Sequence, residues 1–157
     1  EQIISMMIQR FGQVFNQELR DKASQMGLTV HEVSTLAALV EKEAMVAEER
    51  PLIAAVYLNR IKLGMHLGAC PTVLYALGRS SGTVLLKELE VESPYNTYKY
   101  TGLPPGPVSN FGKASLEAVL NPADVDYLYF VSKNDGTHAF ARTLDEHNRN
   151  VALYQGN

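Results

Sequence analysis

The sequence has no long hydrophobic run. The longest purely apolar stretch among its 157 residues extends only from Leu52 to Leu58, whereas a helix that spans a membrane needs about 20 such residues. We therefore expect no membrane span within this chain. The first residues, EQIISMMIQRF, already have the pattern of a helix interior, so we expect the chain to be a piece of a longer protein.

Positive charge is not concentrated anywhere. The lysines and arginines are scattered, the net charge is -3 and the isoelectric point is about 5.8. Proteins that bind nucleic acid collect basic residues on one face, so we expect no nucleic-acid partner. A content of 46% hydrophobic and 20% charged residues is that of an ordinary globular protein, and residues 1–157 are long enough for a single domain with its own core.

Cysteine is nearly absent, because Cys70 is the only one. A single cysteine excludes an internal disulfide bond and a zinc site built from several cysteines. His31 and Glu32 do not begin an HExxH zinc motif, since Thr35 stands where the second histidine would be. No glycine-rich segment ends in the Gly-Lys-Ser/Thr of a phosphate-binding loop. We expect no metal and no cofactor, and a nucleophilic Cys70 paired with a histidine is a minor alternative.

The hydrophobic periodicity predicts helices in the first part of the chain and a small sheet later. Thr29 with Glu32 and Thr143 with Glu146 have the spacing of capping boxes that open helices, and Asn110 is a candidate cap for another helix. The predicted helices span residues 2–26, 30–47, 51–63, 72–77, 112–120 and 143–154, and the predicted strands span residues 126–132 and 137–141. The expected fold class is α+β, with N-terminal helices, then a small antiparallel β-sheet region and a C-terminal helix.

One carboxylate lies on the apolar face of a predicted helix. With about 100° per residue, Leu39, Val40 and Ala47 lie within about 60° of Glu43, while Glu41 lies about 160° away. Apolar surroundings penalise the charged form of a carboxyl group and raise its pKa. A carboxyl group that stays protonated near neutral pH can act as a general acid. Glu43 is therefore the candidate catalytic residue, carried by the N-terminal helices, whereas replacing Glu41 should leave catalysis almost unchanged.

Four segments together resemble one known family. The resemblance covers roughly residues 34–154, and its segments are LVEKEAMVAEERPLIAAVYLNRIKLGMHL, PTVLYALG, SPYNTYKYTGLPPGPVSNFG, and DYLYFVSKNDGTHAF followed by TLDEHNRNV. In this order they resemble the endolytic murein transglycosylase family (MltG, YceG-like). The VEKE, YNTY and GLPPGP motifs are together highly specific to that family.

The resemblance implies an activity and a location. Family members are lyases that cut the glycan strands of peptidoglycan, between N-acetylmuramic acid and N-acetylglucosamine, and leave 1,6-anhydro-muramic ends. Their catalytic glutamate is the second glutamate of the Glu-Lys-Glu segment, which in this chain is Glu43. One N-terminal helix anchors them at the extracytoplasmic face of the bacterial cytoplasmic membrane, and a LysM-like segment precedes the catalytic part. We expect residues 1–157 to be the catalytic part without either, with peptidoglycan strands and cell-wall synthesis proteins as partners.

Candidate substrate contacts lie in the YNTY and PTV motifs. The side chains that we expect to hold the sugar are Tyr95, Asn96, Thr97 and Thr72. Hydroxyl and amide groups can bond to sugar hydroxyls and N-acetyl groups, although a turn held by Asn96 against its own backbone is the alternative. Family members usually carry aspartate where this chain has Cys70, so an acid that could orient the substrate or serve as a second catalytic carboxylate is missing.

Other interpretations stay open. An inactive peptidoglycan-binding or scaffold module of cell-wall synthesis is one, and Cys70 motivates it. A glycoside hydrolase that uses Glu43 together with a second carboxylate is another. That second carboxylate would be one of Glu88, Glu90, Glu92 and Asp124. In the last interpretation, Glu43 has only a structural role and forms an ion pair with Arg50 or Arg60.

Overall fold

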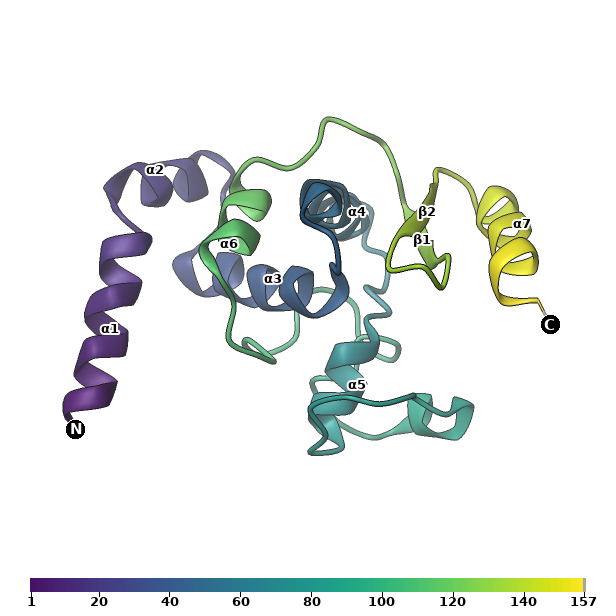
Figure 1. Ribbon diagram of the computed structural model, residues 1–157, viewed down its shortest axis with the longest axis horizontal. Helices are drawn as coiled ribbons and strands as arrows, with labels where there is room; N and C mark the ends of the chain where they lie inside the picture. Colours follow the sequence, from purple (N-terminus) through teal and green to yellow (C-terminus); the bar gives the residue numbers. More distant parts are fainter. Residues whose placement is uncertain (157) are drawn as a thin grey trace.

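The computed structural model describes residues 1–156 and confirms the α+β class. Helices come first, a two-stranded antiparallel sheet follows, and a helix ends the described chain (Figure 1). The helices are α1 (Gln2–Val14), α2 (Gln17–Gln25), α3 (Val30–Glu43), α4 (Arg50–Lys62), α5 (Cys70–Ala76), α6 (Lys113–Leu120) and α7 (Leu144–Gln155). The short 3-10 helices η1 (Ala47–Glu49) and η2 (Leu86–Glu90) and the strands β1 (Tyr129–Ser132) and β2 (His138–Ala141) complete the described elements. Within residues 1–156, no helix has both the length and the hydrophobicity that a membrane crossing requires.

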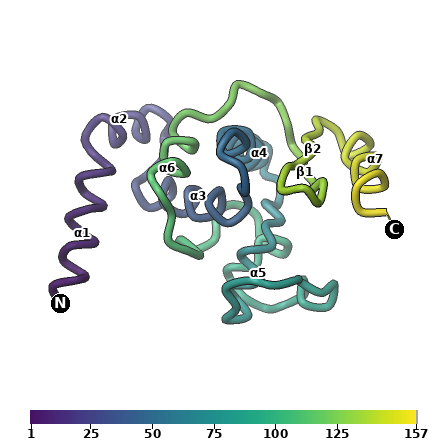
Figure 2. Tube along the Cα trace, viewed as in Figure 1, coloured from purple at the N-terminus to yellow at the C-terminus, as the bar shows by residue number. Residues whose placement is uncertain are grey.

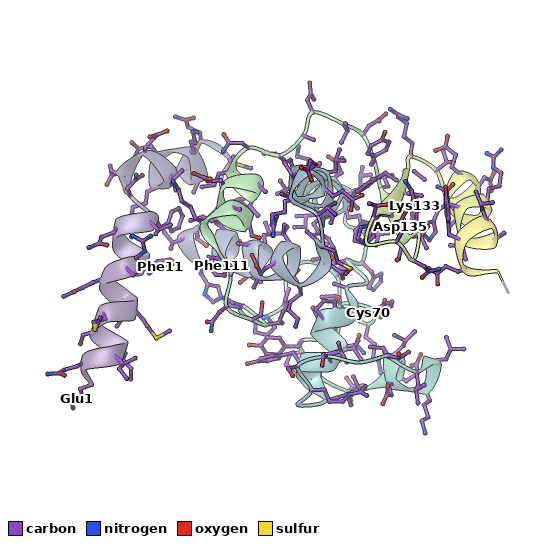
Figure 3. All side chains as sticks on the ribbon, viewed as in Figure 1. Glu1, Phe11, Cys70, Phe111, Lys133 and Asp135 are labelled. Carbon is purple, nitrogen blue, oxygen red and sulfur yellow. The ribbon has the colours of Figure 1, made fainter. Side chains whose placement is uncertain are left out.

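The first predicted helix is wrong in one respect, because it is broken into α1 and α2. The side chain of Asn16 accepts the backbone N–H of Leu19 at 3.2 Å, which is the geometry of a helix N-cap. Phe15 turns into the core at this break and is fully buried. Helix α1 extends away from the rest of the molecule (Figure 2). Phe11 and Phe111 line a cavity of 770 Å³ between α1 and the start of α6 (Figure 3).

Helix α3 is the centre of the core. It packs against α4 and α6, which also pack against each other, and every residue from Val33 to Val40 is buried. The sequence predicted that only one face of this helix is buried, but protein surrounds this part of α3 on all sides. Ser34 and Thr35 tolerate the burial because their hydroxyls donate to carbonyl oxygens of the preceding turn at 2.8 Å. The buried stretch ends at Val40, before the last turn, which carries Glu43.

Helix α3 ends at Glu43, before the predicted boundary at Ala47. Ala44 takes an extended conformation with ψ of 120°, and the chain forms η1 before α4 starts at Arg50. The residues in between are good helix formers, so local propensity does not disclose the break. The break in the helix is required because α4 turns back and packs against α3. Glu43 consequently lies at the carboxyl end of a helix, where the aligned backbone carbonyls disfavour a negative charge.

Strands β1 and β2 form an antiparallel hairpin in which Ser132 pairs with His138. The hairpin packs against α4 and α7 (Figure 1). The first strand begins later than predicted, because α4 uses the preceding backbone. The side chains of Asn59 and Arg60 donate to carbonyl oxygens in the segment 125–128 at 2.6 to 3.1 Å. Those oxygens are therefore not free to pair with a neighbouring strand.

Helix α6 starts at Lys113 with Gly112 as its N-cap, so the predicted cap at Asn110 is wrong. Glycine has no side chain that could accept a hydrogen bond, and Glu41 of α3 supplies the acceptor instead. Its Oε2 accepts the backbone N–H of Gly112 at 3.1 Å and the hydroxyl of Ser115 at 2.5 Å. A carboxylate at a helix N-terminus is favourable, so Glu41 ties α3 to α6.

Candidate active site

Glu43 lies half-buried in the last turn of α3. The hydroxyl of Tyr57, a fully buried residue of α4, donates to its Oε1 at 3.3 Å. Burial raises the pKa of the Glu43 carboxyl, while the charge of His138 and the hydrogen bond from Tyr57 oppose this rise. The position at the carboxyl end of the helix acts in the same direction as burial. Such a carboxyl group keeps its proton to higher pH than usual and can give it to a bound molecule.

The arginines that could have neutralised Glu43 are engaged elsewhere. Arg50 donates to the hydroxyl oxygen of Ser115 at 3.3 Å. Arg60 donates to three backbone carbonyl oxygens at 2.6 to 3.1 Å. Neither arginine bonds to Glu43 within the described residues, so the structure does not contain the ion pair that the sequence left open.

Glu41 serves the fold and is separate from the site. The hydrogen bond from Ser115 is the main cause that lowers the pKa of its carboxyl, and the bond from Gly112 adds to it. Glu41 is thus a carboxylate at neutral pH, bound to the start of α6. Its face of α3 differs from that of Glu43, as the helical spacing predicted. That Glu41 can be replaced without loss of cleavage stays a prediction, but the substitution would cost α6 its cap.

A second group of side chains, linked to Glu43 through Tyr98, comes from the start of α5 and the segment after η2. The Sγ of exposed Cys70 lies 3.1 Å from the hydroxyl of Tyr98, at the end of α5 that faces α3 and α4 (Figure 3). Burial, and then the hydrogen bond with Cys70, raises the pKa of the Tyr98 phenol, and the charge of Glu43 contributes in the same direction. Tyr98 and Glu43 therefore belong to one site. Within the described residues, no three histidine, cysteine, aspartate or glutamate side chains gather in a way that could hold a metal ion.

Three of the predicted sugar-binding side chains face the protein interior. Asn96 is fully buried, its amide donates to two backbone carbonyl oxygens at 2.8 Å, and its Oδ1 accepts the N–H of Tyr98 at 3.0 Å. Thr97 and Thr72 are also buried, and their hydroxyls share a hydrogen bond of 2.9 Å. Both hydroxyls also bond to the backbone of Ala69. These contacts favour the alternative of a held turn that positions Tyr98, and a sugar contact through the three stays a prediction.

Tyr95 is the predicted contact that reaches the surface. It is half-buried, and its ring centroid lies 4.6 Å from that of Tyr75, a residue of α5 that is 44% exposed. Tyr75 follows Cys70 along α5 by about 7.5 Å of helix rise. The two rings form an aromatic surface, and Tyr75 lies on the same helix as Cys70. A contact between these rings and a sugar stays a prediction.

Sequence reasoning missed Tyr57, Glu49 and His138. A tyrosine within an aliphatic run was the available signal for Tyr57, because a buried phenol needs a hydrogen-bond partner. Glu49 accepts both the backbone N–H and the ring Nδ1–H of His138. These two residues are separated by 89 positions, and no local pattern connects them.

Known proteins match this chain over nearly its whole length. The sequence profile of the YceG-like family matches residues 1–153. A Bacillus subtilis protein named endolytic murein transglycosylase is 45% identical, over 98% of this chain and 42% of the relative. A Streptococcus pneumoniae protein of the same name is 40% identical, over 80% of this chain and 24% of the relative. The crystal structure of a YceG-like protein from Listeria monocytogenes superposes with a TM-score of 0.87 at 44% identity, over 94% of this chain and 47% of that one.

The chain spans less than half the length of each of these relatives. The region matched by the family profile includes the helix that carries Glu43, the loop that carries Tyr98 and the hairpin that carries His138. The similarity therefore extends through the whole arrangement around Glu43. On this evidence, the chain belongs to the YceG-like family.

Proposed function

We propose that this chain is the catalytic part of an endolytic murein transglycosylase. One observation carries the proposal: Glu43 is half-buried at the end of α3, bonded to Tyr57, and its pKa is raised by burial. The names of the relatives from Bacillus subtilis and Streptococcus pneumoniae support it. The substrate is the glycan strand of peptidoglycan, and the cleaved bond joins N-acetylmuramic acid to N-acetylglucosamine.

Glu43 acts as the single acid and base of the reaction. In its protonated form it donates to the oxygen that bridges the two sugars, and the bond from this oxygen to the anomeric carbon of the muramic acid breaks. The Glu43 carboxylate then takes the proton of the 6-hydroxyl of the same muramic acid, whose oxygen bonds to the anomeric carbon. Glu43 thereby recovers its proton, no water is consumed, and the new end is a 1,6-anhydro sugar. A group that alternates in this way needs a pKa near the working pH, which burial promotes.

The contacts of Glu88 and Glu92 support a lyase over a hydrolase that would use either of them. A hydrolase requires a second carboxylate about 5–9 Å from the first. Glu88 is paired with Arg79 at 2.8 Å, and Glu92 is paired with Lys99 at 2.7 Å. Two of the candidates for a second catalytic carboxylate are therefore bound within their own loop, whereas the lyase reaction needs only Glu43.

The location and partners of the full-length protein belong to the same proposal. It acts at the extracytoplasmic face of the cytoplasmic membrane, held by an N-terminal anchor, with a LysM-like segment and proteins of cell-wall synthesis beside it. A cysteine introduced on the surface of the full-length protein in intact cells should react with a reagent that does not cross the membrane. Labelling only after lysis would contradict this location.

Digestion of purified peptidoglycan tests the activity. Wild-type chain should release products with anhydro ends, which are one water lighter than hydrolysed ends, and Glu43→Gln should release none. Circular dichroism of Glu43→Gln confirms that the variant is folded. Hydrolysed ends would favour the hydrolase, no products from either protein would favour a scaffold, and full activity of Glu43→Gln would move the acid to another residue.

A further inference from the structure

Glu49 and His138 form a buried pair that the reaction described above does not use. The Glu49 carboxylate accepts the backbone N–H of His138 at 2.8 Å through Oε1, and the ring Nδ1–H at 2.6 Å through Oε2. Glu49 is buried, and only 9% of the His138 side chain is exposed. Both carboxylate oxygens are therefore occupied by donors from one residue.

The double contact fixes the orientation of the His138 ring. One carboxylate holds both the backbone and the imidazole, which restricts rotation of the ring and places a proton on Nδ1. The ring of Phe130 packs edge-on against it, with centroids 5.3 Å apart. The second ring nitrogen, Nε2, has no hydrogen-bond partner among residues 1–156 and is not sealed from solvent. An imidazole oriented by a carboxylate through one nitrogen is an arrangement that enzymes use repeatedly.

Packed aromatic rings connect the pair to Glu43. Glu49 follows Glu43 by six positions in the sequence, so its bonds to His138 tie the hairpin to η1, the segment that follows α3. Tyr57 connects the two from the other side, because its hydroxyl bonds to Glu43 and its ring packs edge-on against Phe130 at 6.0 Å. Phe130 in turn contacts His138. Among the influences that favour the charged form of Glu43, the charge of His138 is the largest.

We propose that Glu49 positions His138 as the group that stabilises the Glu43 carboxylate during the reaction. The inference rests on the proposed function, in which Glu43 is charged between donating its proton and recovering it. Burial and the carboxyl end of α3 both oppose that charge. A positive imidazole held in place by Glu49 offsets part of this cost and makes Glu43 a better acid. His138 acts through Glu43 and is a positioning residue.

The other ionisable groups around Glu43 do not supply this charge. They are Tyr57 from α4 and Tyr98 from the loop after η2, together with Arg60 and Cys70, which interact with these phenols. Burial raises the pKa of both phenols, so they are neutral hydroxyls. Cys70 bonds to Tyr98, and Arg60 is bound to backbone carbonyl oxygens. Among these groups, His138 is thus the one whose positive charge would favour the Glu43 carboxylate.

Carbon-detected NMR of the Glu43 carboxyl tests the pair without substrate. The pKa of Glu43 should rise in His138→Gln, because glutamine carries no charge. It should also rise in Glu49→Gln, because an amide cannot hold the charged imidazole as a carboxylate does. The matched control is His147→Gln on α7, whose ring stacks on Tyr129 at 5.1 Å and which should leave the titration of Glu43 unchanged.

The pH profile of glycan cleavage provides a second readout. The acid must be protonated, so kcat/KM falls as pH rises through the pKa of Glu43. In His138→Gln and Glu49→Gln this basic limb should move to higher pH, and kcat should fall about 10- to 100-fold, as is typical when a supporting partner is lost. If the pair has only a structural role, the two substitutions would lower the amount of folded protein and leave the basic limb of the pH profile unchanged.

An unchanged pKa of Glu43 in both folded variants would overturn the inference. If neither variant folds, the ring nitrogen signals of His138 in the wild-type chain decide. They should show an inflection at the pH where Glu43 titrates, and this inflection should vanish in Glu43→Gln; its absence in the wild type would also overturn the inference. Failure of the wild type to cleave glycan contradicts the proposed function alone, because the titrations need no substrate.

Discussion

Glu41→Gln should lower the stability of the protein at neutral pH, whereas Glu43→Gln should not lower it. Glu41 accepts hydrogen bonds from Gly112 and Ser115 at the start of α6, and these bonds lower the pKa of its carboxyl. Glu41→Gln keeps one acceptor oxygen but loses the negative charge at the helix N-terminus. Glu43→Gln removes a carboxyl group whose charged form is disfavoured in the folded state, and Tyr57 can still donate to the amide oxygen.

The magnitude for Glu41 follows from its two contacts. A hydrogen bond to a charged group contributes about 1.5–3 kcal/mol and one to a neutral group about 0.5–1.5 kcal/mol, and the helix terminus adds about 0.3–1 kcal/mol. Because Glu41 is half-exposed, we expect Glu41→Gln to lower the free energy of unfolding by about 1–2 kcal/mol. In a chain of this length the melting temperature should fall by about 2–8 °C. Glu43→Gln should leave the free energy of unfolding at neutral pH unchanged or higher.

The pH dependence of unfolding separates the two glutamates further. The folded pKa of Glu41 is lowered, so its stabilisation is present above the unfolded value of about 4.3 and is lost as pH falls through the folded pKa. The folded pKa of Glu43 is raised, so its contribution is present below the unfolded value and is lost as pH rises through the folded pKa. The difference in free energy of unfolding between wild type and Glu41→Gln should therefore shrink in acid. The free energy of unfolding of Glu43→Gln should increase relative to that of the wild type as pH rises.

Urea unfolding followed by circular dichroism between pH 3 and pH 8 measures both effects. The control is Glu117→Gln, because Glu117 forms an exposed pair with Lys113 at 3.3 Å on α6 and should change stability by less than about 0.5 kcal/mol. Equal stability of Glu41→Gln and wild type at pH 7 would refute the capping role. If Glu43→Gln lost as much free energy of unfolding as Glu41→Gln, the assignment of a structural role to Glu41 and a chemical role to Glu43 would be refuted.

Three further substitutions test other parts of the site. Cys70→Asp should raise the rate of glycan cleavage by less than about 100-fold and leave the anhydro product unchanged, because an acid that only orients substrate contributes less than a catalytic one; rescue from no detectable turnover would mean that the missing aspartate is catalytic. Asn96→Ala should lower the free energy of unfolding by about 2–4 kcal/mol, since two backbone carbonyl oxygens lose their donor, and a loss below about 0.5 kcal/mol in urea would contradict its role in the turn. Tyr57→Phe should raise the pKa of Glu43, because the hydroxyl favours the carboxylate; an unchanged or lower value in a carbon-detected titration would show that this bond is not formed in solution.

Local sequence signals predicted the fold correctly where short-range contacts create it. Glu32 donates its backbone N–H to Thr29 at 3.1 Å and accepts the backbone N–H of Thr29 at 2.8 Å, so the capping box that opens α3 is confirmed. The hydroxyl of Thr143 likewise accepts the backbone N–H of Glu146. The predictions failed where distant segments decide. The end of α3 depends on the return of α4, and the start of β1 depends on carbonyl oxygens captured by Asn59 on α4.

The sequence by itself determined that Glu43 would share a helix face with Leu39 and Val40, because helical spacing sets which neighbours within α3 lie on one side. Only the tertiary structure decided what else surrounds Glu43, since Tyr57, Tyr98 and His138 come from elements far along the chain. Asn96 resembled a ligand in the sequence because a polar side chain in a loop carries no mark of burial, and the fold uses its hydrogen bonds to hold a turn. Spacing along one helix is a property of the backbone, whereas a contact between distant segments exists only when the whole core has packed.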